Sequence, residues 1–159
     1  MYFAGQTRVS GIAEKISRDR YRTIRNNWKL VDDDKIPDAE KKDKFWKVKP
    51  MTNMILNCCL LNPKNKNVSI DEQMTRYQIK PNPCGMKIFV VAAPDGLSLN
   101  FFFYQGRGDP FVEEDHLQSL GVGGTAVVKL TWNLPTEVSI YMDRFFTSMH
   151  LLDLLHSEA

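Results

Sequence analysis

Two aspartates, Asp71 and Asp143, each end a short run of residues that is typical of a β-strand. The runs are residues 68–70 and 138–142, and β-branched and aromatic side chains are frequent in both. A carboxylate at the end of a buried strand lies where the sheet meets solvent, so two neighbouring strands can present two carboxylates to one divalent cation. Two such cations held about 4 Å apart would activate the attacking oxygen and stabilise the leaving oxygen in phosphodiester cleavage.

The plainer alternative is that both aspartates simply cap loops, and the residues taken alone favour it. We expect Glu72 to be a neighbour rather than a ligand, because strand alternation turns its side chain to the other face. The three histidines have no metal-ligand spacing with one another or with the cysteines. The glycines at 121–124 are not followed by Gly-Lys-Ser/Thr, which excludes a P-loop NTPase.

The elements that would position the aspartates follow from periodicity and turn residues. Residues 87–93 and 97–104 predict two strands joined by a turn at Asp95-Gly96, which is a hairpin signal. A helix is expected up to residue 130, starting after Gly124, and another from residue 151 to the C-terminus. The predicted order is helix, helix, three strands, helix, strand, helix.

The N-terminal part reads as two amphipathic helices. Residues 17–30 predict the first, with Ser17 as its N-cap, and Pro50 fits the first turn of the second. Residues 31–44 predict a surface loop. We expect the apolar residues of both helices to pack in the core, namely Ile16, Tyr21, Ile24, Trp28 and Val31 in the first and Met51, Met54, Ile55, Cys58 and Leu61 in the second.

Charge is unevenly distributed, although the net charge is only +2. Residues 8–49 hold 13 Lys and Arg against 8 Asp and Glu, and residues 50–159 hold 8 against 11. A basic helix of this kind could contact DNA phosphates, and a solvated helix face is the alternative. The candidate contacts are Arg18, Arg20, Arg22, Arg25 and Lys29.

Three cysteines, Cys58, Cys59 and Cys84, give an odd count without a CxxC motif, so we expect reduced and mostly buried thiols. The first thirty residues contain no apolar core of a signal peptide. No apolar run approaches the roughly 20 residues that cross a bilayer. These features favour a cytosolic or nuclear protein without a membrane partner.

An ordered set of segments resembles the piggyBac-type transposases. Residues 68–74 (VSIDEQM) are similar to the family's first catalytic-aspartate motif, and residues 141–148 (YMDRFFTS) to the second. Residues 80–87 resemble its KPxPxGxK stretch, and residues 89–104 resemble the hairpin that follows. Further similar segments are residues 17–21, 43–50, 120–124 and 127–130.

The resemblance implies an α/β fold with a partial RNase H-like mixed sheet, flanking helices and a helical N-terminal part. It divides the chain into a helical segment, residues 1–66, and a partial catalytic core, residues 67–159. It also implies that Asp71 and Asp143 are catalytic and bind Mg²⁺ from adjacent strands. DNA is the implied partner, with Lys80 and Lys87 as further contacts, in the nucleus and without a small-molecule substrate.

Two departures from the family bear on activity. The family's third catalytic aspartate lies downstream of residue 159, and the stretch between Met74 and Lys80 is roughly ten residues shorter than in the family. We therefore expect a transposase-derived protein that is inactive as it stands and retains some DNA binding. The alternatives are a nuclease whose third carboxylate comes from another, fuller transposase chain, and a remnant of a mobile element without function.

Overall fold

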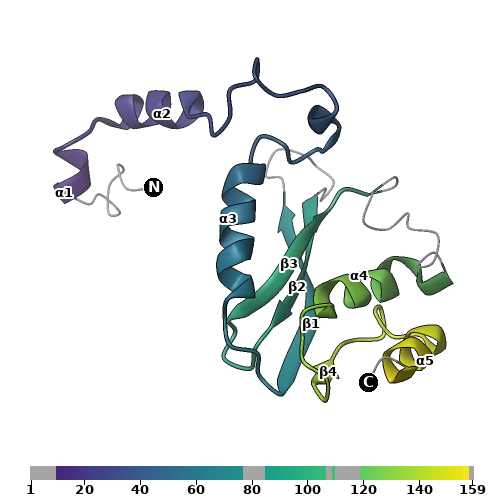
Figure 1. The fold of residues 1–159 in the computed structure, drawn as a ribbon. Coiled ribbons are helices and arrows are strands. Elements are labelled where there is room, and N and C mark those ends of the chain that lie inside the picture. The colour runs from purple at the N-terminus through teal and green to yellow at the C-terminus, as the bar shows by residue number, and fades with distance from the viewer. Residues whose placement is uncertain (1–9, 77–84, 107–108, 110–118, 158–159) are drawn as a thin grey trace.

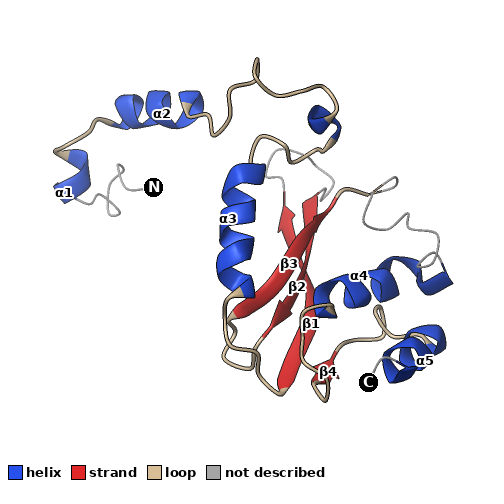
Figure 2. Ribbon diagram, in the orientation of Figure 1, coloured by secondary structure: helices blue, strands red, loops and turns tan. Residues whose placement is uncertain are grey.

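The computed structural model describes residues 10–76, 85–106, 109 and 119–157 (Figure 1). Its elements, in chain order, are α1 (Ser10–Ala13), α2 (Arg18–Asn27), the 3₁₀ turn η2 (Glu40–Lys42), α3 (Lys49–Leu60), β1 (Asn67–Arg76), β2 (Gly85–Ala92), β3 (Ser98–Tyr104), α4 (Gly121–Thr131), β4 (Ser139–Tyr141) and α5 (Met149–Ser157). The predicted order is confirmed, and α1 and η2 are additions to it. Figure 2 shows the same elements coloured by type.

The four strands form one mixed sheet in the order β3-β2-β1-β4. β1 pairs antiparallel with β2, and β2 pairs antiparallel with β3. β4 pairs parallel with β1, after a crossover through β2, β3 and α4. This α/β architecture is consistent with a partial RNase H-like arrangement, as the sequence predicted.

The predicted hairpin between β2 and β3 is confirmed. The Ala93 N–H donates to the Leu97 carbonyl at 2.9 Å, and Gly96 adopts a φ of 86°, which a side chain would strain. The Asp95 carboxylate accepts the Leu97 N–H at 3.0 Å and closes the turn.

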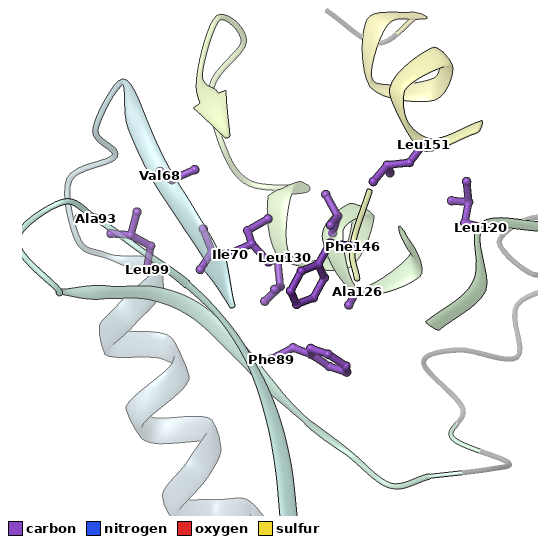
Figure 3. Packing of buried hydrophobic residues seen from close by; sticks show 12 residues of the cluster. Val68, Ile70, Phe89, Ala93, Leu99, Leu120, Ala126, Leu130, Phe146 and Leu151 are labelled. Carbon is purple, nitrogen blue, oxygen red and sulfur yellow. The ribbon is translucent and has the colours of Figure 1, made fainter. Parts of the chain in front are cut away.

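A hydrophobic core fills one face of the sheet, under α4 and α5 (Figure 3). Phe89 of β2 lies at its centre, fully buried, with the ring of Phe146 edge-on at a centroid distance of 5.9 Å. α4 is predominantly apolar and contributes Ala126, Val127 and Leu130, all without exposed surface. The core therefore joins β2 to the chain segment that follows β4.

On the opposite face of the sheet, α3 packs against β3 (Figure 1). The ring of Phe45, just before α3, lies 4.9 Å from that of Phe103, and the Asn62 amide donates to the Ser98 carbonyl at 3.2 Å. The aromatic run of β3 is thus divided between the two sides, as strand alternation requires.

The prediction that the apolar faces of α2 and α3 pack in the core is wrong. Met54 is 63% exposed, Leu61 85% and Trp28 73%. α3 turns its other side, around Thr52 and Leu56, toward β3, and α2 lies away from the sheet (Figure 1). Helical periodicity marks an apolar stripe but does not show which neighbour is available to cover it.

Smaller differences concern boundaries and thiols. α2 is capped by Ser17, whose side chain accepts the Arg20 N–H at 3.2 Å, as predicted. α4 begins at Gly121, four residues earlier than expected. Cys58 is exposed rather than buried, and both Cys58 and Cys59 are free thiols. In the described part of the chain, no helix is long and apolar enough to cross a membrane.

Candidate functional site

Asp71 lies in the middle of β1, not at its end as the sequence suggested. The strand continues to Arg76 because β2 pairs with it to its end, from Ser69 opposite Ala92 to Arg76 opposite Gly85. Val68 and Ile70 point into the core, so alternation turns Asp71 to the other face, where it is exposed. The carboxylate is therefore on the sheet surface and accessible to solvent.

Asp143 lies two residues beyond β4, and β4 pairs parallel with β1. The register ends with Ser69 opposite Tyr141, two residues before each aspartate. Residues opposite one another in neighbouring strands share a face, and such strands lie about 4.8 Å apart. The expectation that the strand of Asp71 and the strand that leads to Asp143 lie side by side is confirmed, and the joint binding of a metal ion by the two carboxylates stays a prediction.

Each carboxylate is held in place by one backbone N–H. The Glu72 N–H donates to Asp71 Oδ1 at 2.7 Å, and the Phe145 N–H donates to Asp143 Oδ1 at 2.8 Å. Neither Oδ2 accepts a hydrogen bond from any described residue. Each aspartate therefore has an oriented side chain with oxygen-ligand capacity left over.

These groups fit a hard divalent cation such as Mg²⁺, which prefers oxygen ligands and is commonly bound through one or two carboxylates and several waters. Within the described ranges, no group of three or more His, Cys, Asp or Glu side chains is arranged to hold a metal ion. If the two aspartates bind a cation together, they would supply two protein ligands, and the other coordination positions would be left to water or to phosphate oxygens.

Glu72 does not belong to this pair, as expected from strand alternation. Its side chain forms an ion pair with Lys87, with Oε1 3.3 Å from the lysine Nζ, and both side chains are largely buried. Its second oxygen, Oε2, is buried without a hydrogen-bond partner among the described residues. Glu72 therefore has a structural partner on the face opposite Asp71.

A glycine in α4 sets the position of the segment that carries Asp143. A Cβ built on Gly123 would lie 2.3 Å from the Phe145 carbonyl oxygen and 3.1 Å from the Phe146 Cα. The helix can approach this backbone so closely only because residue 123 has no side chain. Sequence reasoning noted the glycines at 121–124 but missed this role, and the signal was their position inside an otherwise apolar helix.

The predicted DNA contacts occupy different surroundings. The four arginines of α2 are exposed, and Lys29 forms an ion pair with Asp33 at 3.5 Å. Lys87 is paired with Glu72, and Lys80 lies outside the described residues. α2 thus carries four exposed cations, namely Arg18, Arg20, Arg22 and Arg25. Their contact with DNA stays a prediction.

Comparison with known proteins assigns the class. The sequence model of the family described as Transposase IS4 matches the chain over residues 1–159. The chain therefore belongs to this transposase family, whose DDE-type members generally use divalent metal ions and act on DNA. Neither the curated proteins nor the solved structures contain a match to the chain.

Proposed function

We propose that the chain is a piggyBac-type transposase-derived domain that binds Mg²⁺ weakly through Asp71 and Asp143 and does not cleave DNA alone. The observation that supports the proposal is the parallel pairing of β1, which holds Asp71, with β4, which ends two residues before Asp143; both aspartates are exposed. The same two residues lie in the segments that resemble the catalytic motifs of the piggyBac family.

Weak metal binding and inactivity follow from the number of ligands. Phosphoryl transfer between two metal ions needs a ligand set that holds both ions in line with the reacting phosphate. The described residues offer two carboxylates, and even an outer ligand partner is commonly worth 10–100-fold in affinity. Two carboxylates by themselves therefore hold one cation loosely.

DNA is the proposed partner, because a transposase acts on DNA and α2 presents its arginines to solvent. Arginine contacts to phosphates are independent of base sequence, and salt weakens them. A nuclear location, without a membrane or small-molecule partner, follows from that proposal. The Arg18→Ala, Arg22→Ala double variant should weaken binding to duplex DNA and reduce its salt dependence.

A nuclease that borrows its third carboxylate from a fuller transposase chain is the second candidate. The exposed position of Asp71 favours it, since a partner could reach that face of the sheet. This candidate predicts nicking of TTAA-flanked DNA in Mg²⁺ when a fuller chain is added that keeps its third catalytic aspartate and lacks the first two. Asp71→Asn in the present chain should abolish that nicking. A chain without a cooperative melt would instead support the remnant.

The proposed metal site is tested by thermal melting with and without Mg²⁺ or Mn²⁺. At a concentration ten times the dissociation constant, binding stabilises the folded state by about 1.4 kcal/mol. For a chain of this size that is an increase in Tm of roughly 3–6 °C. Asp71→Asn and Asp143→Asn should each abolish the increase.

Asp153 provides the matched control, since it is an exposed aspartate on α5. Asp153→Asn should keep the metal-dependent shift of the unmodified chain. A shift that persists in both Asp71→Asn and Asp143→Asn would assign the metal to another site. A cooperative melt that is indifferent to metal up to several tens of millimolar would refute metal binding and leave DNA binding as the proposed function.

A further inference from the structure

Lys87 of β2 has its ammonium group enclosed by a carboxylate and two aromatic rings. Its Nζ lies 3.3 Å from Glu72 Oε1, 4.6 Å from the centroid of the Phe145 ring and 5.5 Å from that of Phe89. The side chain is 25% exposed. The residue that the sequence offered as a DNA contact is thus engaged in contacts within the domain.

The partners of Lys87 are the residues that hold the two aspartates. Glu72 follows Asp71 in β1, and its N–H is the one that donates to the Asp71 carboxylate. Phe145 is two residues beyond Asp143, and its N–H donates to the Asp143 carboxylate. One ammonium group therefore contacts a side chain from each aspartate-bearing segment.

β4 alone gives Asp143 little support, because it is a three-residue strand that ends at Tyr141. The segment after it makes local hydrogen bonds, and the buried Phe146 anchors it in the core. Phe145 is 45% exposed, and the ring contact with Lys87 is one of the interactions that fix its position relative to the sheet.

Glu72 adds a second constraint, because one of its carboxylate oxygens is buried and has no hydrogen-bond partner among the described residues. A buried carboxylate without a cation is costly, so the ion pair fixes the Lys87 side chain in this position. The ammonium group is thereby oriented toward the Phe145 ring rather than into solvent.

We propose that Lys87 is a positioning residue that links the segments of Asp71 and Asp143 and fixes the spacing of their carboxylates. The proposal rests on the metal site proposed above, but the link between the two segments can be measured without a metal. A charge effect and a positioning effect of Lys87 would change metal affinity in opposite directions. By Coulomb's law alone, loss of the positive charge would strengthen cation binding. Loss of positioning would weaken it.

The first test measures Mn²⁺ affinity by calorimetry for three variants of the full chain. Lys87→Met keeps the length of the side chain without the charge and should weaken Mn²⁺ binding roughly tenfold, the lower end of the range for outer partners of metal ligands. Lys87→Arg keeps the charge and ring contact and should restore affinity to within about threefold of the unmodified chain. Lys66→Met, at an exposed lysine just before β1, should bind as the unmodified chain does.

The second test follows hydrogen exchange at the Glu72 and Phe145 amides, which donate to the two aspartates. Lys87→Met should speed exchange at Phe145 roughly tenfold or more, while the amide of Val127 in α4 keeps its rate. If Lys87→Met fails to fold, Glu72→Gln removes the same ion pair with a smaller change of shape and is measured in its place.

The outcomes separate the two proposals. If the unmodified chain binds no Mn²⁺, the proposed metal site fails, and the exchange at Phe145 still decides whether Lys87 positions the Asp143 segment. Unchanged exchange at Phe145 in a folded Lys87→Met variant would overturn the inference, as would tighter Mn²⁺ binding. A drop in DNA affinity without change in either readout would return Lys87 to the role of a phosphate contact.

Discussion

Gly123 lies in α4 against the backbone of the segment that carries Asp143, and Gly123→Ala is the most direct test of that packing. The added Cβ would lie 2.3 Å from the Phe145 carbonyl oxygen, 3.1 Å from its carbonyl carbon and 3.1 Å from the Phe146 Cα. These are backbone atoms, so a rotamer change cannot relieve the contact. Either α4 or the segment after β4 must move.

Two opposing contributions determine the change in the free energy of unfolding of Gly123→Ala. Alanine is favoured over glycine inside a helix by about 1 kcal/mol. Overpacking a well-packed core costs typically about 1–3 kcal/mol, and contact with backbone rather than side chain puts this site at the upper end of that range or beyond. We expect a net loss of about 2 kcal/mol, which for a chain of this size is a decrease in Tm of roughly 4–8 °C.

Chemical denaturation followed by circular dichroism measures the loss, and Gly11→Ala is the matched control. Gly11 lies in α1 with no atom within 4 Å of a built Cβ, so alanine there should leave stability unchanged or slightly higher. If Gly123→Ala were as stable as the unmodified chain, the close approach of α4 to Phe145 would be wrong. The variant should also lose the metal-dependent shift, because the movement displaces Asp143.

The remaining predictions concern the core, the thiols and the surface of α3. Asn100 is 5% exposed and its amide donates to the Leu130 carbonyl at 3.1 Å, so Asn100→Ala should destabilise the chain by about 1–3 kcal/mol in chemical denaturation. Burial raises the pKa of the Cys59 thiol, and the neighbouring Cys58 raises it further. Iodoacetamide near neutral pH should therefore label Cys59 slowly, and its labelling should accelerate as the pH rises through the raised pKa, as mass spectrometry would show. Met54→Gln should change stability by less than about 0.5 kcal/mol, because the side chain is 63% exposed.

Each of these has a control in the same chain. Asn65→Ala, at an exposed asparagine, should leave stability unchanged. Alkylation of the Cys58→Ser, Cys84→Ser variant isolates the Cys59 rate, and labelling at the rate of an ordinary free thiol would refute its raised pKa. A loss of more than about 1 kcal/mol for Met54→Gln would show that the exposed side of α3 is covered in solution.

The strands could be predicted from the sequence because their signals are local. The turn at Asp95-Gly96 fixes the hairpin through one carboxylate and one positive φ, and both requirements are met by residue type. The length of β1 could not be predicted in the same way. Its extension beyond Asp71 depends on pairing with β2. In that register Asp71 lies opposite Val90, 19 residues further along the chain, and such a distant partner is not visible in a local pattern.

For the helices, the starting residues could be predicted from the sequence, but the buried side of α3 could not. Ser17 and Pro50 marked the starts of α2 and α3 correctly, since capping is also local. The buried side of α3 could not be identified, because Leu56 and the apolar residues on the exposed side are alike in hydrophobicity. The side of α3 that is buried depends on β3, because the aromatic side chains of β3 occupy the sheet face beneath the helix.

The two aspartates could be chosen from the sequence, but the support that positions them could not. Phe89 is paired with Glu72, next to Asp71, in the β1–β2 register, and its ring contacts those of Phe145 and Phe146 at centroid distances of 6.3 and 5.9 Å. It thus connects the strand of Asp71 to the segment of Asp143 from the buried side of the sheet. Lys87 makes a second connection along the same strand. If the two carboxylates bind a metal ion as proposed, changes in β2 should therefore alter metal affinity more than changes at the exposed surface of either aspartate segment, as calorimetry with Mn²⁺ would show.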